Sequence, residues 1–311
     1  MIGGEPQGPY LAPGEWHLFL GYRGLNSERH YRGGDYQEEI RSGVVNSQHL
    51  LTVHVSHALT RQLNLSLEVP IAWNGFSLLR PLPADPAVRV RQAVRARGIG
   101  DVALQGRYWL LNTEKNPNAN IALELGFKFP TGNAGVRDNV FNQLVPVDQS
   151  IQPGDSGFGF SAGVQAFRTR GDFTLYFQGA YLFNPRNTSG VNAFFSALNN
   201  RKFENSVPDQ FLLRAGVVHQ IEEFPGLALS LGYRLEGVPV RDAIGDSDGF
   251  RRPGLFGFIE PGIIFTRGRE TWSLLVPVTV YINVRDNPNT TRIEDATVAP
   301  LMVLVGYGSK L

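Results

Sequence analysis

Seven ionisable side chains lie in segments where polar or small residues alternate with apolar ones. Residues two apart on a β-strand share one face of a sheet, so each charge would lie opposite an apolar row. Such charges can line a passage that selects ions, or they can pair with opposite charges and brace the interior. The sequence leaves both roles open. The residues are Glu68, Arg107, Glu124, Lys128, Arg214, Arg234 and Glu260.

Three histidines in one segment have the composition of a metal site but not its spacing. On a strand His54 would face away from His49 and His57, and those two are far apart along the chain. The sequence contains no cysteine, which excludes thiolate ligands and disulfides. Glycine-rich nucleotide-binding motifs are also missing. We therefore expect neither a metal site nor a cofactor.

One short motif has the composition of a catalytic site. Gly154-Asp155-Ser156-Gly157 matches the nucleophile motif of trypsin-like proteases, but the following Phe158-Gly159-Phe160 departs from it. A catalytic serine needs a histidine base, and the sequence has no Ala-Ala-His-Cys counterpart and no other Ser–His pairing that we can identify. A Gly/Asp/Ser loop entering a strand explains the motif. We predict no catalytic residues, and a lipid-modifying enzyme is the least favoured class.

The elements that position these side chains are β-strands, because hydrophobicity alternates with period two. In residues 121–129 the odd positions are all apolar, and the even positions are polar or small. Other segments repeat the pattern, so each predicted strand has one apolar face. We predict that these faces point outward, and that Arg at Leu175 costs about 2–4 kcal/mol if that position is near a bilayer midplane. The outward residues chosen are Leu123, Leu125, Phe127, Phe173, Leu175, Phe177, Leu229 and Leu231.

Twelve strands are expected, joined by connections that alternate between long and short. The strands lie near 15–22, 47–56, 62–72, 100–110, 119–129, 157–168, 172–184, 209–220, 227–236, 255–266, 271–284 and 298–310. The long connections are 23–46, 73–99, 130–156, 185–208, 237–254 and 285–297. The short ones centre on residues 59–61, 116–118, 170–172, 223–225 and 267–269.

Long loops on one rim and tight turns on the other are typical of bacterial outer-membrane barrels. We predict an all-β, antiparallel up-and-down barrel of about twelve strands. Residues 1–311 would form one transmembrane domain, with 1–14 as a periplasmic segment and both termini on the short-turn rim. A soluble sandwich or lipocalin-like barrel also alternates, but it gives no reason for the loop asymmetry, and its apolar side chains would interdigitate.

Composition agrees with this location. Mean hydropathy is −0.15, and no stretch approaches the roughly 18 apolar residues of a transmembrane helix, because alternating strands average to neutral. The segment starting at Met1 lacks the features of a signal peptide, so we expect the chain to begin near a mature N-terminus. The formal net charge is +1, which gives no general attraction for nucleic acid.

Two further segments suggest partners. Five arginines in 80–98 could fold inward to constrict a lumen, bind lipopolysaccharide phosphates, or form a plain solvated loop; they are Arg80, Arg89, Arg91, Arg95 and Arg97. The row Leu301, Val303, Val305, Tyr307 resembles the last-strand signal read by the barrel-assembly machinery. It departs from that signal at Ser309 and Leu311.

Three stretches together resemble a known family. They are Gly21-Tyr22-Arg23 with Ser27-Glu28-Arg29, Gly98-Ile99-Gly100-Asp101-Val102 leading to Arg107-Tyr108-Trp109-Leu110-Leu111, and Gly126-Phe127-Lys128-Phe129-Pro130-Thr131-Gly132. The set is similar to outer-membrane proteins associated with a meta-pathway of phenol degradation, often called transporters. The resemblance is strongest in the first half. It implies a barrel and uptake of small, often aromatic, compounds, and it carries over no site residues.

The sequence thus favours passive passage or uptake of a small molecule, aromatic or hydrophobic in character, across the outer membrane. The alternative is a non-conducting structural barrel that anchors a partner in the envelope. With either role, the seven charges would line the lumen, because charge on the lipid face is costly.

Overall fold

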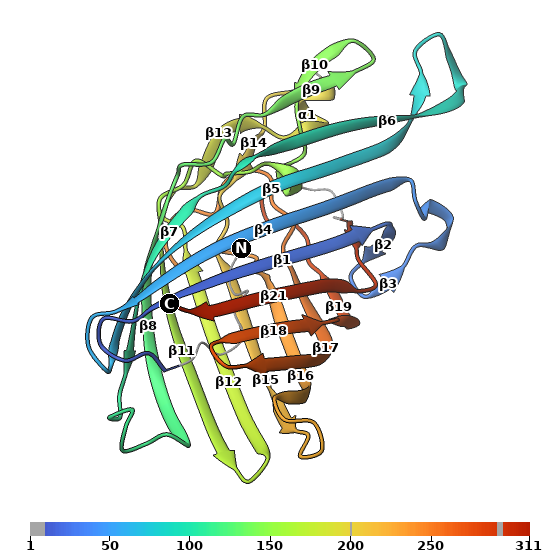
Figure 1. Cartoon of the computed structure of the whole chain (residues 1–311). Helices are drawn as coiled ribbons and strands as arrows, with labels where there is room; N and C mark the ends of the chain where they lie inside the picture. The colour runs from blue at the N-terminus through green and yellow to red at the C-terminus, as the bar shows by residue number, and fades with distance from the viewer. Residues whose placement is uncertain (1–9, 200, 291–294) are drawn as a thin grey trace.

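The computed structural model describes residues 10–199, 201–290 and 295–311. Long antiparallel strands close into a 12-stranded barrel, in which β1 pairs with β21 (Figure 1). The fourth wall strand is split into β6 and β7, and the eleventh into β18 and β19. The wall consists of β1 (Trp16–Ser27), β4 (Val44–Ala58), β5 (Leu63–Leu82), β6 (Asp85–Ile99), β7 (Val102–Trp109), β8 (Ala119–Phe129), β11 (Gly159–Arg170), β12 (Phe173–Phe183), β15 (Gln210–Gln220), β16 (Leu227–Val238), β17 (Gly254–Arg267), β18 (Glu270–Leu275), β19 (Val278–Val284) and β21 (Met302–Lys310).

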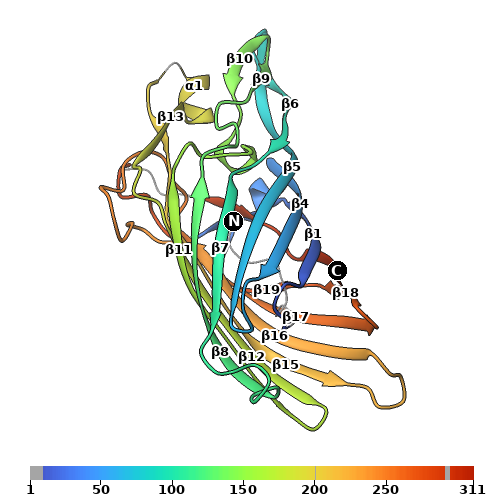
Figure 2. The same cartoon turned by 60° about the vertical axis from the view of Figure 1, so that its left-hand side comes forward.

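The smaller elements lie in the long connections and gather at one end of the barrel (Figures 1 and 2). At the other end the chain turns back tightly, and Gly171 and Gly268 adopt positive φ of 57° and 62° in two of these turns. The predicted barrel and its loop asymmetry are therefore confirmed. The smaller elements are β2 (Arg29–Arg32), β3 (Asp35–Tyr36), η1 (Glu38–Ile40), β9 (Arg137–Val140), β10 (Gln143–Pro146), η2 (Gln149–Ile151), β13 (Thr188–Asn192), α1 (Phe194–Leu198), β14 (Glu204–Ser206) and β20 (Ala296–Val298).

The alternation of side chains fixes the register of the wall. Leu125 is 68% exposed and pairs across the sheet with Gly106 and Ala162, whereas the adjacent Glu124 faces inward beside Arg107. A register slip of one residue would place the charged row in lipid. All eight residues predicted to face outward are exposed on the outer surface, between 39% for Phe177 and 68% for Leu125.

Two stretches of the wall differ from the sequence expectation. The predicted loop 73–99 is mostly a hairpin, since β5 continues to Leu82 and β6 returns from Asp85, well beyond the barrel rim (Figure 1). Prolines are rare inside strands, so the prolines in this segment favoured a loop over the alternating strand pattern. The predicted strand 271–284 is interrupted between β18 and β19 at Pro277, which has no N–H for the ladder.

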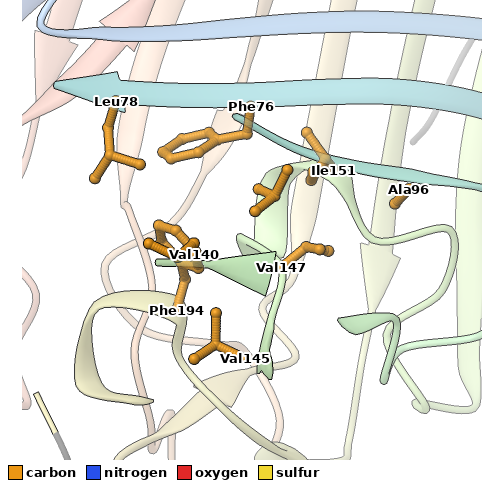
Figure 3. Close-up of a cluster of buried hydrophobic side chains, with 9 residues drawn as sticks. Phe76, Leu78, Ala96, Val140, Val145, Val147, Ile151 and Phe194 are labelled. Carbon is orange, nitrogen blue, oxygen red and sulfur yellow. The ribbon is translucent and has the colours of Figure 1, made fainter. Parts of the chain in front are cut away.

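A hydrophobic cluster lies at the long-loop end of the barrel, on the inner face of the β5–β6 hairpin. Phe76, Leu78, Val94 and Ala96 from the β5–β6 hairpin pack with residues of β9, β10, η2 and α1 (Figure 3). Phe194 of α1 is 1% exposed and meets the Phe76 ring edge-on, with 5.4 Å between centroids. This cluster, rather than the lumen, is the main apolar core of the molecule.

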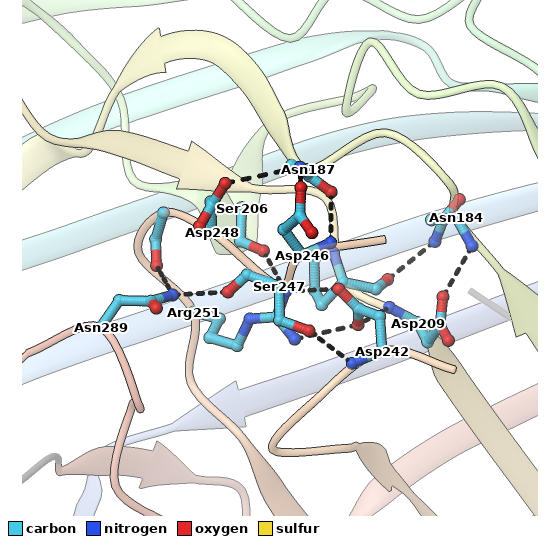
Figure 4. A network of polar contacts seen from close by, with 12 residues as sticks. Asn184, Asn187, Ser206, Asp209, Asp242, Asp246, Ser247, Asp248, Arg251 and Asn289 are labelled. Atoms are coloured by element: carbon cyan, nitrogen blue, oxygen red, sulfur yellow. Dashed lines mark hydrogen bonds and ion pairs between the residues drawn. The ribbon is translucent and has the colours of Figure 1, made fainter. Parts of the chain in front are cut away.

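Polar contacts tie the remaining long loops together (Figure 4). Arg251 and Asp242 form an ion pair in which both side chains are almost fully buried, and Arg251 also donates to Ser206 Oγ at 2.6 Å. Asp209 accepts from the backbone N–H of Asn184 at 2.7 Å and of Ala243 at 2.8 Å. The connections between β12 and β17 thus form one structured cap.

Position along the strand sets the cost of a charge on the lipid face. Leu125 lies near the middle of β8, but Leu175 is close to the short-turn end of β12 and pairs with the exposed Arg168. We therefore expect Leu125→Arg to cost about 2–4 kcal/mol of unfolding free energy and Leu175→Arg only about 0–1. Urea unfolding in liposomes measures the free energy of unfolding of both variants. Equal losses would show that Leu175 is as close to the bilayer midplane as Leu125.

Candidate functional site

All seven charged residues selected from the sequence lie on the inner face of the wall. The residues opposite them on the neighbouring strands face inward as well. Glu68, Arg107, Glu124 and Lys128 line a lumen cavity. Arg214, Arg234 and Glu260 are buried beside it, with side chains 5%, 2% and 1% exposed. The structure places the residues there, but their role as pore lining or brace is a separate question.

Two ion pairs lie at the cavity wall. Arg107 Nε donates to Glu124 Oε1 at 2.6 Å between β7 and β8. Lys128, at the end of β8, forms an ion pair with Asp155, and its Nζ lies 3.9 Å from Asp101 Oδ2. Asp101 accepts from the N–H groups of Gly132 at 2.9 Å and Asp155 at 3.1 Å. These contacts fix the connection after β8 to the wall.

A second charged cluster spans β15, β16 and β17. Arg214 forms an ion pair with Glu260, and Arg234 Nη1 lies 4.0 Å from the other oxygen of that carboxylate. Arg234 also donates to Glu236 from Nε at 2.8 Å. Buried charges of this kind are tolerated only when they are paired. The cluster fills this side of the lumen.

The lumen holds two adjoining cavities, of about 520 Å³ and 360 Å³. Their walls share a narrow set of side chains, which includes Arg23 of β1, Gln48 of β4 and Gln210 of β15. Phenylalanine rings from β5 and β17 and aliphatic side chains from β4, β20 and β21 surround the smaller cavity. A mostly apolar space with a few convergent polar groups is typical of a small-molecule site.

The segment around η2 crosses the lumen on the side of the long loops. Arg252 donates to both carboxylate oxygens of Asp148, at 3.1 and 3.0 Å. On the opposite wall Asn46 donates to Ser150 Oγ at 2.7 Å and Asn74 to the Ile151 carbonyl at 3.3 Å. We call residues 148–152 the crossing segment.

The crossing segment corrects one sequence interpretation. The arginine-rich stretch 80–98 does not fold inward, because it forms the outer hairpin of β5 and β6, in which Arg89, Arg91, Arg95 and Arg97 are exposed. The inward-folded segment comes instead from the next long connection. Sequence composition gave no signal for it, since Asp148 and Ser150 resemble ordinary loop residues.

Three aromatic rings pack together inside the wall at the short-turn end. The Tyr10 ring contacts Trp109 edge-on, with 4.9 Å between centroids, and Phe167 at 5.6 Å. Trp109 is 1% exposed. The Tyr10 hydroxyl donates to the Asn116 carbonyl at 3.1 Å, and Lys310 donates to the Tyr10 carbonyl at 2.7 Å.

Comparison with known proteins agrees with this geometry. The profile of a family described as "Putative MetA-pathway of phenol degradation" matches residues 40–247. The chain belongs to this family. Its fold is that of an outer-membrane channel from Pseudomonas putida F1, with a TM-score of 0.67 at 13% identity over 99% of this chain and 100% of that one. A search of curated proteins finds no match.

Two solved toluene transporters are more distant from this family member. The Ralstonia pickettii protein TbuX gives a TM-score of 0.46 at 11% identity, over 97% of this chain and 90% of that one. The P. putida protein TodX gives 0.46 at 10%, over 96% and 91%. The family match and the fold shared with the P. putida F1 channel identify the chain as an outer-membrane β-barrel with a channel fold, whose outer surface contacts membrane lipid.

Other motifs of this family member have structural roles. Within the described ranges, no group of three or more His, Asp or Glu residues could hold a metal ion. Asp155, from the protease-like motif, is the partner of Lys128. In the part of the chain that the structure describes, no helix is long and apolar enough to span a bilayer. The predicted segment 1–14 is described only from residue 10 onward.

Proposed function

We propose that this barrel carries a small hydrophobic molecule across the outer membrane through its lumen. The observation that supports this is the pair of adjoining, mostly apolar cavities inside the wall. A barrel with a purely structural role would gain more from a filled interior, because empty space forfeits packing energy. The family description and the channel fold point in the same direction. We infer transport rather than catalysis.

We also propose that most of the seven predicted charges brace the barrel. Arg107 is paired with Glu124, Lys128 with Asp155, and Arg214 with Glu260, so these groups neutralise each other beside the cavities. A paired charge contributes little to ion selectivity. The substrate path then follows the apolar walls, and Glu68 lines the larger cavity.

Blocking the larger cavity tests this function. Ala103 lies on its wall, and Ala215 is exposed on the lipid face. Gram-negative cells that express the protein should take up labelled 1-naphthol several-fold faster than cells without it. We expect Ala103→Trp to remove the gain and Ala215→Trp to keep it. Equal uptake with and without the protein would favour the anchoring alternative.

The β5–β6 hairpin offers a surface for lipopolysaccharide. Arg89, Arg91, Arg95 and Arg97 alternate on one exposed face, which continues the lipid-facing row at Ile99 and Trp73. Among described residues, Arg89, Arg95 and Arg97 have no carboxylate within ion-pair distance. Guanidinium groups bind phosphate in bidentate fashion. We propose that this arginine row binds lipid A phosphates.

The matched test replaces three arginines on each rim. Arg89, Arg95 and Arg97 changed to Gln should lower the lipopolysaccharide retained on the purified barrel several-fold, and this binding should weaken with salt. The same changes at the exposed Arg170, Arg267 and Arg269 on the short-turn rim should leave it unchanged. Equal retention by both triple variants would refute the assignment.

Two remaining sequence predictions stay proposals. The outward row of β21, with Leu301 just before it and Val303, Val305 and Tyr307 within it, would serve as the signal for the barrel-assembly machinery. Residues 1–311 would form one domain, with the segment 1–14 on the periplasmic side. The described part of that segment lies at the short-turn end, where Gly14 donates to the Ala58 carbonyl at 2.8 Å.

A further inference from the structure

Arg23 is a charged side chain of the lumen that has no ion-pair partner among the described residues. It lies on the inner face of β1, where its register partners are the apolar Leu50 and Leu304. Its Nη2 donates to Gln48 Oε1 at 3.3 Å, but its Nε is buried without a hydrogen-bond partner. No carboxylate of the described residues lies within ion-pair distance of it. Arg23 therefore has unused donor capacity inside the barrel.

The charges around Arg23 do not balance. Among the described residues, the cluster contains three guanidinium groups, from Arg23, Arg214 and Arg234, and two carboxylates, from Glu236 and Glu260. Glu260 is engaged by Arg214, and Glu236 accepts from Arg234 at 2.8 Å. Arg23 is the surplus cation. Because an unpaired charge in a low-dielectric interior is costly, an anion would bind there favourably.

The position of Arg23 defines what kind of anion fits. It lies on the wall of both cavities, together with Gln48, Ser150 and Gln210, whose amides and hydroxyl can complete a head-group site. The other arginine shared by the two walls, Arg252, is already held by Asp148. A guanidinium that has no ion-pair partner among the described residues and lies beside two neutral amides suits a single carboxylate.

The space next to this head-group site is apolar. The smaller cavity, of about 360 Å³, is bounded by Phe76, Phe256 and Phe258 and by Leu25, Val298 and Met302. It can hold an aromatic ring or a short alkyl chain, and the carboxylates of Glu236 and Asp295 in its wall disfavour a second acidic group. A ligand that fits both the head-group site and the smaller cavity has an apolar body and one terminal carboxylate.

We propose that Arg23 is the head-group site for hydrophobic monocarboxylates, with the apolar body in the smaller cavity. This inference rests on the proposed transport through the lumen and narrows its substrate class. Arg23 acts as a selectivity residue: it discriminates an acid from the corresponding neutral molecule by a charge-assisted hydrogen bond.

The test compares two probes that differ in charge, 4-phenylbutanoate and 4-phenylbutan-1-ol. Isothermal titration of the purified barrel in non-ionic detergent gives a Kd for each. We expect the acid to bind wild type about tenfold or more tightly than the alcohol, in line with a hydrogen bond to a charged group. Arg23→Gln should remove that preference and leave alcohol binding unchanged, whereas Arg23→Lys should keep part of it.

The control is Arg267→Gln, which removes an exposed arginine from the short-turn rim and should keep the wild-type preference. Equal affinity of the wild-type protein for the acid and the alcohol would overturn the inference. This comparison does not depend on whether any variant folds. Retained preference in Arg23→Gln would overturn it as well. If only the alcohol binds, the inference about acids fails and the proposed function stands; if neither probe binds, both fail.

Discussion

Replacing Glu260 with Gln should lower the free energy of unfolding by about 3–5 kcal/mol. Glu260 is 1% exposed, pairs with Arg214, and lies 4.0 Å from Arg234. The substitution keeps the shape of the side chain but leaves two buried guanidinium groups without their shared anion. Urea unfolding in liposomes, followed by tryptophan fluorescence, measures the loss.

The exposed ion pair of Arg61 and Glu114 provides the control. Its atoms are 2.6 Å apart, but the side chains are 53% and 59% exposed at the short-turn end. Glu114→Gln should therefore cost less than about 1 kcal/mol. Adding Arg214→Met to Glu260→Gln should recover part of the stability, because it removes one orphaned charge. A loss below 1 kcal/mol in Glu260→Gln would show that the cluster is wetted and does not brace the wall.

Releasing the crossing segment should open the lumen. In Asp148→Asn the ion pair between Asp148 and Arg252 is lost, and this tie of residues 148–152 to the far wall is weakened. Breaking a buried ion pair shifts such an equilibrium by several kcal/mol. We expect single-channel conductance in planar bilayers to rise about tenfold or more over wild type, against no change for the exposed Asp246→Asn.

The effect of pH gives an independent check. Burial alone would raise the pKa of Asp148, but the Arg252 charge and the hydrogen bonds from Arg252 and Ser150 outweigh it and hold the pKa below its usual value. A lowered carboxyl pKa means that the tie is present at neutral pH and lost as pH falls through that lowered value. Wild-type conductance should rise only in strong acid, and Asp148→Asn should lack this rise. Equal conductance of the two proteins at neutral pH would show that another contact closes the lumen.

The wall could be predicted from the sequence because one bilayer constraint acts on every strand. Residues such as Leu125 and Glu124 alternate for a local reason, and a local pattern is visible in the chain. The same parity placed the seven charged residues in the lumen. It could not give their partners, since the pairing of Arg214 on β15 with Glu260 on β17 depends on the register of both strands with β16, which lies between them.

The loops and the acid-binding residue were beyond sequence reasoning. The contact of Asp148 with Arg252 joins residues 104 positions apart, and no periodicity marks either one. In the sequence, Arg23 stands out only as part of a stretch that resembles the family, because the first strand is predicted to end at residue 22, whereas β1 runs to Ser27. Its importance comes from what surrounds it, and only the folded barrel shows that Leu50 and Leu304 offer it no counter-charge.

The seam between β1 and β21 has a consequence for how the molecule is made. Its register runs from His17 with Lys310 to Leu25 with Met302, so it joins the two extremes of the chain. Until it forms, both strands present unpaired backbone edges, which invite pairing with other chains. Closing so long a loop carries a large entropy cost before any reward, which slows folding. An isolated chain should therefore refold slowly and aggregate readily. A folding catalyst that holds β1 until β21 has formed should raise the yield of closed barrel, without needing to speed the formation of any single hairpin.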